Sequence, residues 1–147
     1  MPVSTPAETI ERLFEILING SLDDRAELYA PDVVIEMPYA PAAMPSIVQG
    51  REELRTRMKA AEGLWSYDKV GNVHLHQTDD PEVVVAEYQV HGKVTATGKA
   101  FVFSYIMVTR VRDGLIVSTR DYFNPLESAA ALGRTPELLA ALLSEGE

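Results

Sequence analysis

The sequence has no cysteine among its 147 residues. This absence excludes disulfide bonds, thiolate nucleophiles and zinc sites with thiolate ligands. Basic residues are also few, since 13 Lys and Arg face 22 Asp and Glu and the formal net charge is −9. Nucleic acids and anionic membrane surfaces bind clusters of Lys and Arg, and the sequence holds no such cluster. We therefore expect neither nucleic acid nor a membrane as a partner.

Long hydrophobic runs are missing as well. The longest mostly apolar stretch covers residues 101–108, which is far too short for a transmembrane helix. The first residues lack the basic start and the apolar run of a signal peptide, so a cytoplasmic location is expected. A length of 147 residues is typical of one domain. Because no repeat or linker divides the chain, residues 1–147 are interpreted as a single domain.

Helix signals are present near both ends of the chain. Thr5-Pro6-Ala7-Glu8 has the pattern of a capping box with proline at the first helical position. The apolar residues that follow have the spacing of one buried helix face; they are Ile10, Leu13, Phe14 and Leu17. Further helices are expected at residues 22–29, from residue 50, at residues 124–132 and from residue 135.

Strand signals fill the second half of the chain. Apolar and β-branched runs separated by turn residues predict strands, and the short connections imply an antiparallel meander. Helices grouped before strands indicate an α+β domain, in which a curved antiparallel sheet wraps around the N-terminal helices. A sheet that curls around helices in this way forms a cone, and a concave apolar pocket is expected at the open end of the cone. The expected strands cover residues 33–37, 65–77, 83–91, 99–111 and 115–123.

Asp121 is the candidate acid or base. Strand alternation places Thr119, Asp121 and Phe123 on one face of the last strand. If that face points inward, burial raises the pKa of Asp121 and makes the carboxyl usable for proton transfer. The alternative is an outward Asp121 that pairs with an arginine such as Arg110.

Other candidates have two interpretations each. Arg57 lies on or near the inner face of its helix, but it can equally form a surface ion pair with Glu53, one turn earlier. His91 can shuttle protons or lie at the surface. His74 and His76 share a strand face, but a metal site needs three or four convergent ligands, so no metal is expected. Trp65, Tyr67 and Tyr88 either line a pocket or are simply favourable strand residues.

The order of elements resembles the nuclear transport factor 2-like superfamily and, within it, the SnoaL-like group that includes polyketide cyclases. The chain is also similar to the phenazine-biosynthesis A/B proteins. The resemblance implies a cystatin-like α+β barrel, a homodimer formed through the outer sheet face, and a pocket without a cofactor for a small hydrophobic or cyclic metabolite. It is carried by Glu36-Met37-Pro38-Tyr39-Ala40-Pro41, Gly50-Arg51-Glu52, Thr78-Asp79-Asp80-Pro81, Glu87, His91-Gly92-Lys93 and Arg120-Asp121-Tyr122-Phe123-Asn124-Pro125-Leu126.

The resemblance also implies a function. It suggests acid/base proton transfer on a cyclic or polyketide-like carbonyl compound, of isomerase or cyclase type, with the acidic residue at Asp121. It places Arg57 where the phenazine group has its catalytic histidine. An arginine stays protonated and cannot replace that histidine in proton transfer, so phenazine-type condensation is not expected. Arg57 or Tyr39 would instead stabilise a developing oxyanion.

The expected substrate-binding residues are Met37, Trp65, Tyr88, His91, Phe103, Tyr105 and Phe123. Trp65, Phe103, Tyr105 and Phe123 would form the walls of the pocket. A non-catalytic domain of the same fold, which binds a hydrophobic ligand or only dimerises, is the alternative to an enzyme.

Overall fold

Helix α1 (Pro6–Asn19) begins at the predicted capping box. The computed structural model describes residues 3–42 and 44–145. In it, the Glu8 backbone N–H donates to Thr5 Oγ1 at 3.2 Å and the Thr5 backbone N–H donates to Glu8 Oε1 at 3.0 Å. These bonds satisfy backbone groups that a helix start leaves unpaired. The helix then buries Ile10, Leu13 and Phe14 in the core.

Helix α2 (Leu22–Ala26) is shorter than the helix predicted for residues 22–29, and strand β1 (Tyr29–Glu36) starts earlier than predicted. Both predictions are wrong for the same reason, because Tyr29 pairs with Ile116 of the last strand and is buried. Pro31 is compatible with the strand since the pairing is irregular between Tyr29 and Val34. Burial in the sheet outweighs the local helix preference of this segment.

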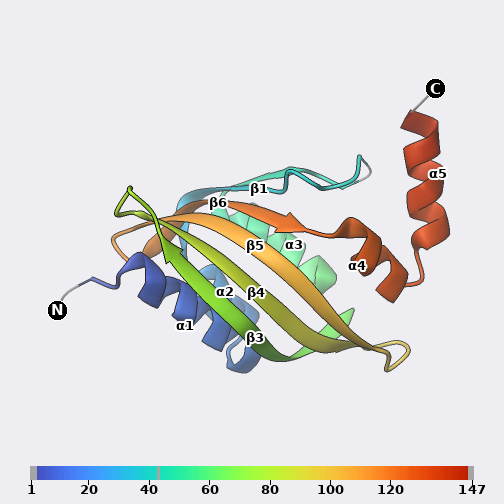
Figure 1. Ribbon diagram of the computed structural model, residues 1–147, viewed down its shortest axis with the longest axis horizontal. Coiled ribbons are helices and arrows are strands. Elements are labelled where there is room, and N and C mark those ends of the chain that lie inside the picture. The colour runs from blue at the N-terminus through green and yellow to red at the C-terminus, as the bar shows by residue number, and fades with distance from the viewer. Residues whose placement is uncertain (1–2, 43, 146–147) are drawn as a thin grey trace.

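One sheet contains every strand. β1 pairs with β6 in parallel, and the other neighbouring strands pair antiparallel. The α+β fold with a curved sheet around N-terminal helices is confirmed, but the sheet is mixed and stays open, with β2 and β3 at its edges (Figure 1). The sheet order is β2-β1-β6-β5-β4-β3, with β2 at Ile47–Gln49, β3 at Trp65–Gln77, β4 at Val83–Val94, β5 at Ala100–Arg112 and β6 at Leu115–Phe123.

Irregular pairing between β3 and β4 bends the sheet. The register shifts between Tyr67 and Lys69 and again between Gly71 and His74. Extra residues of this kind bend a strand and increase its twist. The bend brings Gly92 so close to β3 that a Cβ on it would lie 2.3 Å from the Ser66 carbonyl oxygen. Only glycine fits at this position.

The helices are arranged in two groups. Helices α1 and α3 (Arg51–Ala61) pack against the sheet, and α2 packs against these two helices. The core includes the fully buried Ile10, Val33 and Ile116. Helices α4 (Pro125–Ala131) and α5 (Thr135–Glu145) follow β6, and α5 extends away from the sheet (Figure 1). No helix within the described residues is long and apolar enough to cross a membrane.

We expect Gly92→Ala to destabilise the protein by about 1–3 kcal/mol, which is the usual cost of forcing an extra methyl group into a filled site. Chemical unfolding followed by circular dichroism measures the change. Gly71→Ala is the matched control, because its Cβ would meet His91 Nε2 at an ordinary 3.6 Å. Equal stability of the two variants would contradict the close approach at Gly92.

Candidate active site

A cavity of about 520 Å³ lies between the helices and the inner face of the sheet. This volume suits a small metabolite. Most of the surrounding side chains are apolar, as at Leu13, Met37, Met58 and Trp65. Among the described residues, the polar lining consists of one carboxyl group, two guanidinium groups and four phenols. They belong to Asp121, Arg25, Arg57, Tyr29, Tyr67, Tyr88 and Tyr105.

Asp121 faces this cavity from β6. The side chain borders the cavity, and the carboxyl group is buried among protein atoms. This burial raises the pKa of Asp121 to about 6, although a hydrogen bond from Thr119 acts in the opposite direction. Arg110 pairs instead with Asp80 and Glu82, each at 2.9 Å. Asp121 is therefore an inward carboxyl that can hold or release a proton near neutral pH.

Two buried threonines fix the orientation of the carboxyl. Thr119 Oγ1 donates to Asp121 Oδ1 at 2.7 Å, and Thr109 Oγ1 lies 2.9 Å from Thr119 Oγ1. The Thr119 hydroxyl has only one hydrogen to donate. That hydrogen is committed to Asp121, so Thr109 is the donor in the second bond. These two hydrogen bonds fix one oxygen of the Asp121 carboxyl next to β6, so the carboxyl is directed toward the cavity.

Four phenols line the same cavity as the carboxyl. Burial, together with the negative charge of Asp121, raises the pKa of Tyr29, Tyr88 and Tyr105. The rings of Tyr88 and Tyr105 are stacked, with their centroids 5.2 Å apart. Phe14 packs on Tyr88 with a centroid separation of 4.6 Å. These phenols stay protonated and can donate hydrogen bonds inside the cavity.

Two arginines line the helical side of the cavity. Arg57 makes the surface pair with Glu53, since its Nη2 lies 2.8 Å from Glu53 Oε1, and it also borders the cavity. Both interpretations of Arg57 are therefore realised at once. Its Nε is buried and has no hydrogen-bond partner among the residues that the structure describes. Arg25 enters the cavity from α2, and its Nε lies 3.0 Å from Met58 Sδ.

The other candidate residues are divided between the cavity and its surroundings. Met37, Trp65, Tyr88 and Tyr105 line the cavity. Phe103 lies behind this wall, stacked on Phe101 at 4.1 Å and edge-on to Trp65 at 5.8 Å.

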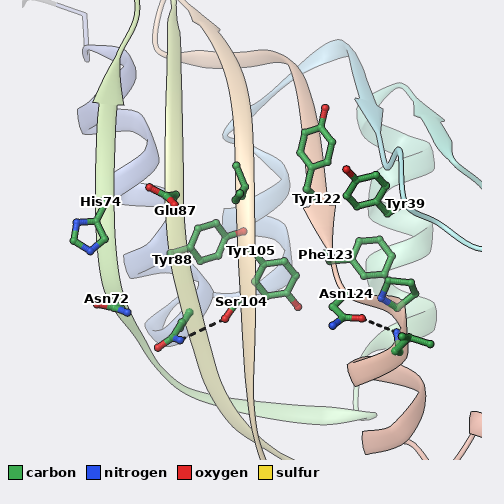
Figure 2. Close-up of a pocket in the computed structure, with 14 residues that line it drawn as sticks. Tyr39, Asn72, His74, Glu87, Tyr88, Ser104, Tyr105, Tyr122, Phe123 and Asn124 are labelled. Atoms are coloured by element: carbon green, nitrogen blue, oxygen red, sulfur yellow. Dashed lines mark hydrogen bonds between the residues drawn. The ribbon is translucent and has the colours of Figure 1, made fainter.

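The opposite face of the sheet carries an open groove of about 830 Å³. Tyr39 lies there, with 62% of its surface exposed and its ring 5.3 Å from that of Tyr122. Figure 2 shows Tyr39 and Tyr122 beside Phe123, with His74 and Glu87 across the sheet. His91 alternates with the inward Val90 on β4 and also faces outward.

Sequence reasoning missed Tyr29 and Arg25 as cavity residues, whereas Tyr67 was a candidate and lines the cavity. Tyr29 was expected at the end of a helix, where it would have no defined relation to Asp121. A signal was available in the run Tyr29-Ala30-Pro31-Asp32-Val33-Val34, since proline is tolerated in an edge or irregular strand. A strand beginning at Tyr29 would have placed its ring beside the last strand.

Helices packed on a curved open sheet are the architecture of the nuclear transport factor 2-like superfamily. Within it, the model of the SnoaL-like domain matches residues 10–119, and the chain belongs to this family.

Several known proteins are similar to this chain. An uncharacterised PhzA/B-like protein of Pseudomonas aeruginosa is 32% identical over 126 residues, which cover 86% of this chain and 89% of that protein. A solved Bacillus subtilis structure, provisionally described as an isomerase, is 30% identical with a TM-score of 0.83, covering 88% of this chain and 94% of that one. IdmH of Streptomyces antibioticus, provisionally described as a polyketide cyclase, is 26% identical with a TM-score of 0.67, covering 88% and 99%.

We expect Asp121→Asn to stabilise the protein above about pH 7. The folded-state pKa of Asp121 is raised from 3.8 to about 6, so the folded protein binds this proton more tightly than the unfolded chain does. The ionised carboxyl therefore costs stability at high pH, by up to roughly 3 kcal/mol for a shift of about two units. That cost disappears as the pH falls from about 6 toward 4.

Denaturant unfolding of both proteins across this pH range measures the effect. Asp68→Asn, at an exposed position of β3, serves as the comparison. A stability difference that does not change with pH would contradict the burial of an ionisable Asp121.

Proposed function

We propose that the protein is a cofactor-independent enzyme that transfers a proton on a cyclic or polyketide-like carbonyl compound, as an isomerase or cyclase. The observation that carries the proposal is the inward carboxyl of Asp121, whose pKa is about 6, in a cavity walled by aromatic and apolar side chains. A carboxyl with a pKa near the working pH can both accept and return a proton.

The proposed reaction begins when the ionised Asp121, held by Thr119, takes a proton from a carbon next to the substrate carbonyl. The electron pair of the broken C–H bond moves into the carbonyl group and forms an enolate. Protonated phenols of Tyr29, Tyr88 and Tyr105 donate hydrogen bonds to the developing oxyanion. Asp121 then returns the proton to another carbon in an isomerisation. In a cyclisation, the enolate carbon instead bonds to a second carbonyl carbon, whose oxygen receives the proton.

This assignment gives the phenols the role that the family resemblance suggests for Tyr39 or Arg57. Tyr39 lies in the groove on the far face of the sheet. Arg57 borders the cavity, but the pKa of Asp121 responds to burial and Thr119 and not to the Arg57 charge. The phenols, by contrast, lie within the electrostatic reach of Asp121. Phenazine-type condensation is not proposed, because Arg57 cannot act as the proton-transferring histidine.

The relatives support this reaction class. The Bacillus subtilis structure is provisionally described as an isomerase and IdmH as a polyketide cyclase. Both descriptions are compatible with enolate chemistry in one cavity. The apolar lining of the cavity favours a small hydrophobic or cyclic metabolite as the substrate.

We expect the wild-type protein to accelerate exchange of the hydrogens next to the carbonyl group of a cyclic ketone in deuterium oxide, followed by proton NMR. Asp121→Asn should lower the rate by about 100-fold or more, because it removes the proton-transferring group. Glu36→Gln, at an exposed position of β1, is the control and should keep the full rate.

The pH dependence sharpens this test. With Asp121 as the base, the exchange rate should rise with pH through about 6, where the carboxyl ionises. Full activity of Asp121→Asn would refute the catalytic role. Saturable ligand binding with no exchange in the wild-type protein would identify a non-catalytic binding domain instead.

We also propose that the protein forms a homodimer through the outer face of the sheet. Val102 and Ile106 expose 46% and 42% of their surface on β5, and Ile106 lines the outer groove. Exposed apolar faces of this kind usually mediate association.

Sedimentation equilibrium should give twice the monomer mass for the wild-type protein. Ile106→Glu should give a monomer, because it places a charge in the interface. Ile47→Glu is the control, since Ile47 is 52% exposed on the edge strand β2. A monomeric wild-type protein at micromolar concentration, or equal effects of both substitutions, would contradict this interface.

A further inference from the structure

The charges of the cavity are separated between its two walls. Asp121 lies on the sheet side, on β6, whereas Arg25 and Arg57 enter from helices α2 and α3. Neither arginine contributes to the pKa of Asp121, which responds to burial and to Thr119. Beyond the effect of burial, the pKa of Tyr29 is raised by the charge of Asp121 and lowered by that of Arg25, so its phenol lies within electrostatic reach of both walls. The cavity therefore has a negative group on its sheet wall and positive groups on its helical wall.

The two other arginines of α3, Arg51 and Arg55, lie outside the cavity and have carboxylate partners. Arg55 on α3 pairs with Asp23, Glu27 and Glu52. Arg51, on the same helix, lies 3.8 Å from Glu27 Oε2 and donates from Nε to the Tyr29 carbonyl oxygen at 2.8 Å. The positive charges of these side chains are therefore balanced by carboxylates of the protein itself.

The two arginines that line the cavity have poorer hydrogen-bond acceptors for their Nε–H groups. Arg57 uses Nη2 for Glu53, but its buried Nε–H has no acceptor among the described residues. The Nε–H of Arg25 faces the thioether of Met58, which is a weak acceptor. A buried charged donor without a good acceptor is costly. An anionic ligand group would supply the missing acceptors, because guanidinium groups match the geometry of carboxylates.

We propose that the substrate carries a carboxylate, which Arg57 and Arg25 bind at the helical wall while the enolisable carbon lies at Asp121. The substrate class is therefore a ring compound with both a ketone and a carboxylate, a cyclic keto acid. This inference rests on the proposed function for the ketone, but the carboxylate site stands on the arginines alone. Arg57 thereby acts as a substrate-binding residue rather than as a proton donor or acceptor.

The experiment measures ligand binding and needs no turnover. Benzoate and cyclohexanecarboxylate are titrated into the isotopically labelled protein near neutral pH, and each is compared with its methyl ester by NMR chemical-shift changes. The acids should bind at least about 10-fold more tightly than the esters, because hydrogen bonds to charged groups are strong in a buried site. The side-chain Nε–H signal of Arg57 should move on addition of the acids.

Substitutions then show which side chains cause the tighter binding of the acids. Arg57→Gln and Arg25→Gln should each reduce the preference for the acid by about 10-fold. Arg57→Lys keeps the charge but loses the Nε–H, so it should retain only part of the preference. Arg120→Gln removes one positive charge at an exposed position of β6 and should leave the preference unchanged, which controls for net charge.

The two proposals fail in different ways. Equal affinity for acids and esters, or no saturable binding of any acid, overturns the carboxylate site whatever the ketone-exchange result. An equal loss in Arg120→Gln and Arg57→Gln also overturns it. A preserved preference for acids in Asp121→Asn, together with no ketone exchange in the wild-type protein, supports the carboxylate site and rejects the proposed catalysis.

Discussion

Burial of one carboxyl group is the constraint on which the chemistry of this protein depends. Asp121 is held by Thr119 inside an apolar cavity, where burial raises the pKa of the carboxyl to about 6. The ionised carboxylate is costly there, because burial removes water that would hydrogen-bond to it and few protein groups take the place of that water. The same cost makes the carboxyl useful, since it keeps the proton exchangeable near neutral pH. The site thus gives up some folding stability for reactivity.

The fold maintains this environment through the shape of the sheet. The irregular pairing of β3 with β4 and the close approach at Gly92 bend the long strands. The bent sheet receives α1 through side chains such as Phe14, which packs on Tyr88 at the edge of the cavity. Helix α3 closes the other side with Leu54 and Arg57. The cavity is therefore a consequence of a curved sheet that its helices do not fill completely.

Local signals made much of this predictable from the sequence. The capping box at Thr5 and the meander that places Asp121 and Thr119 on one face both follow from short-range patterns. The parallel pairing of β1 with β6 was not predictable, because partners such as Tyr29 and Ile116 are far apart in the chain and share no turn. Tyr39 illustrates the same limit, since nothing local tells which side of the sheet its loop covers.

The burial of Asp121 is tested most directly by an NMR titration of its side-chain carboxyl carbon in the ligand-free protein. A buried Asp121 should titrate with a midpoint near 6, well above the ordinary value of 3.8. A midpoint at or below 3.8 would mean that the carboxyl is solvated or paired with a positive charge. That result would contradict both the burial of the acid and its proposed role in proton transfer.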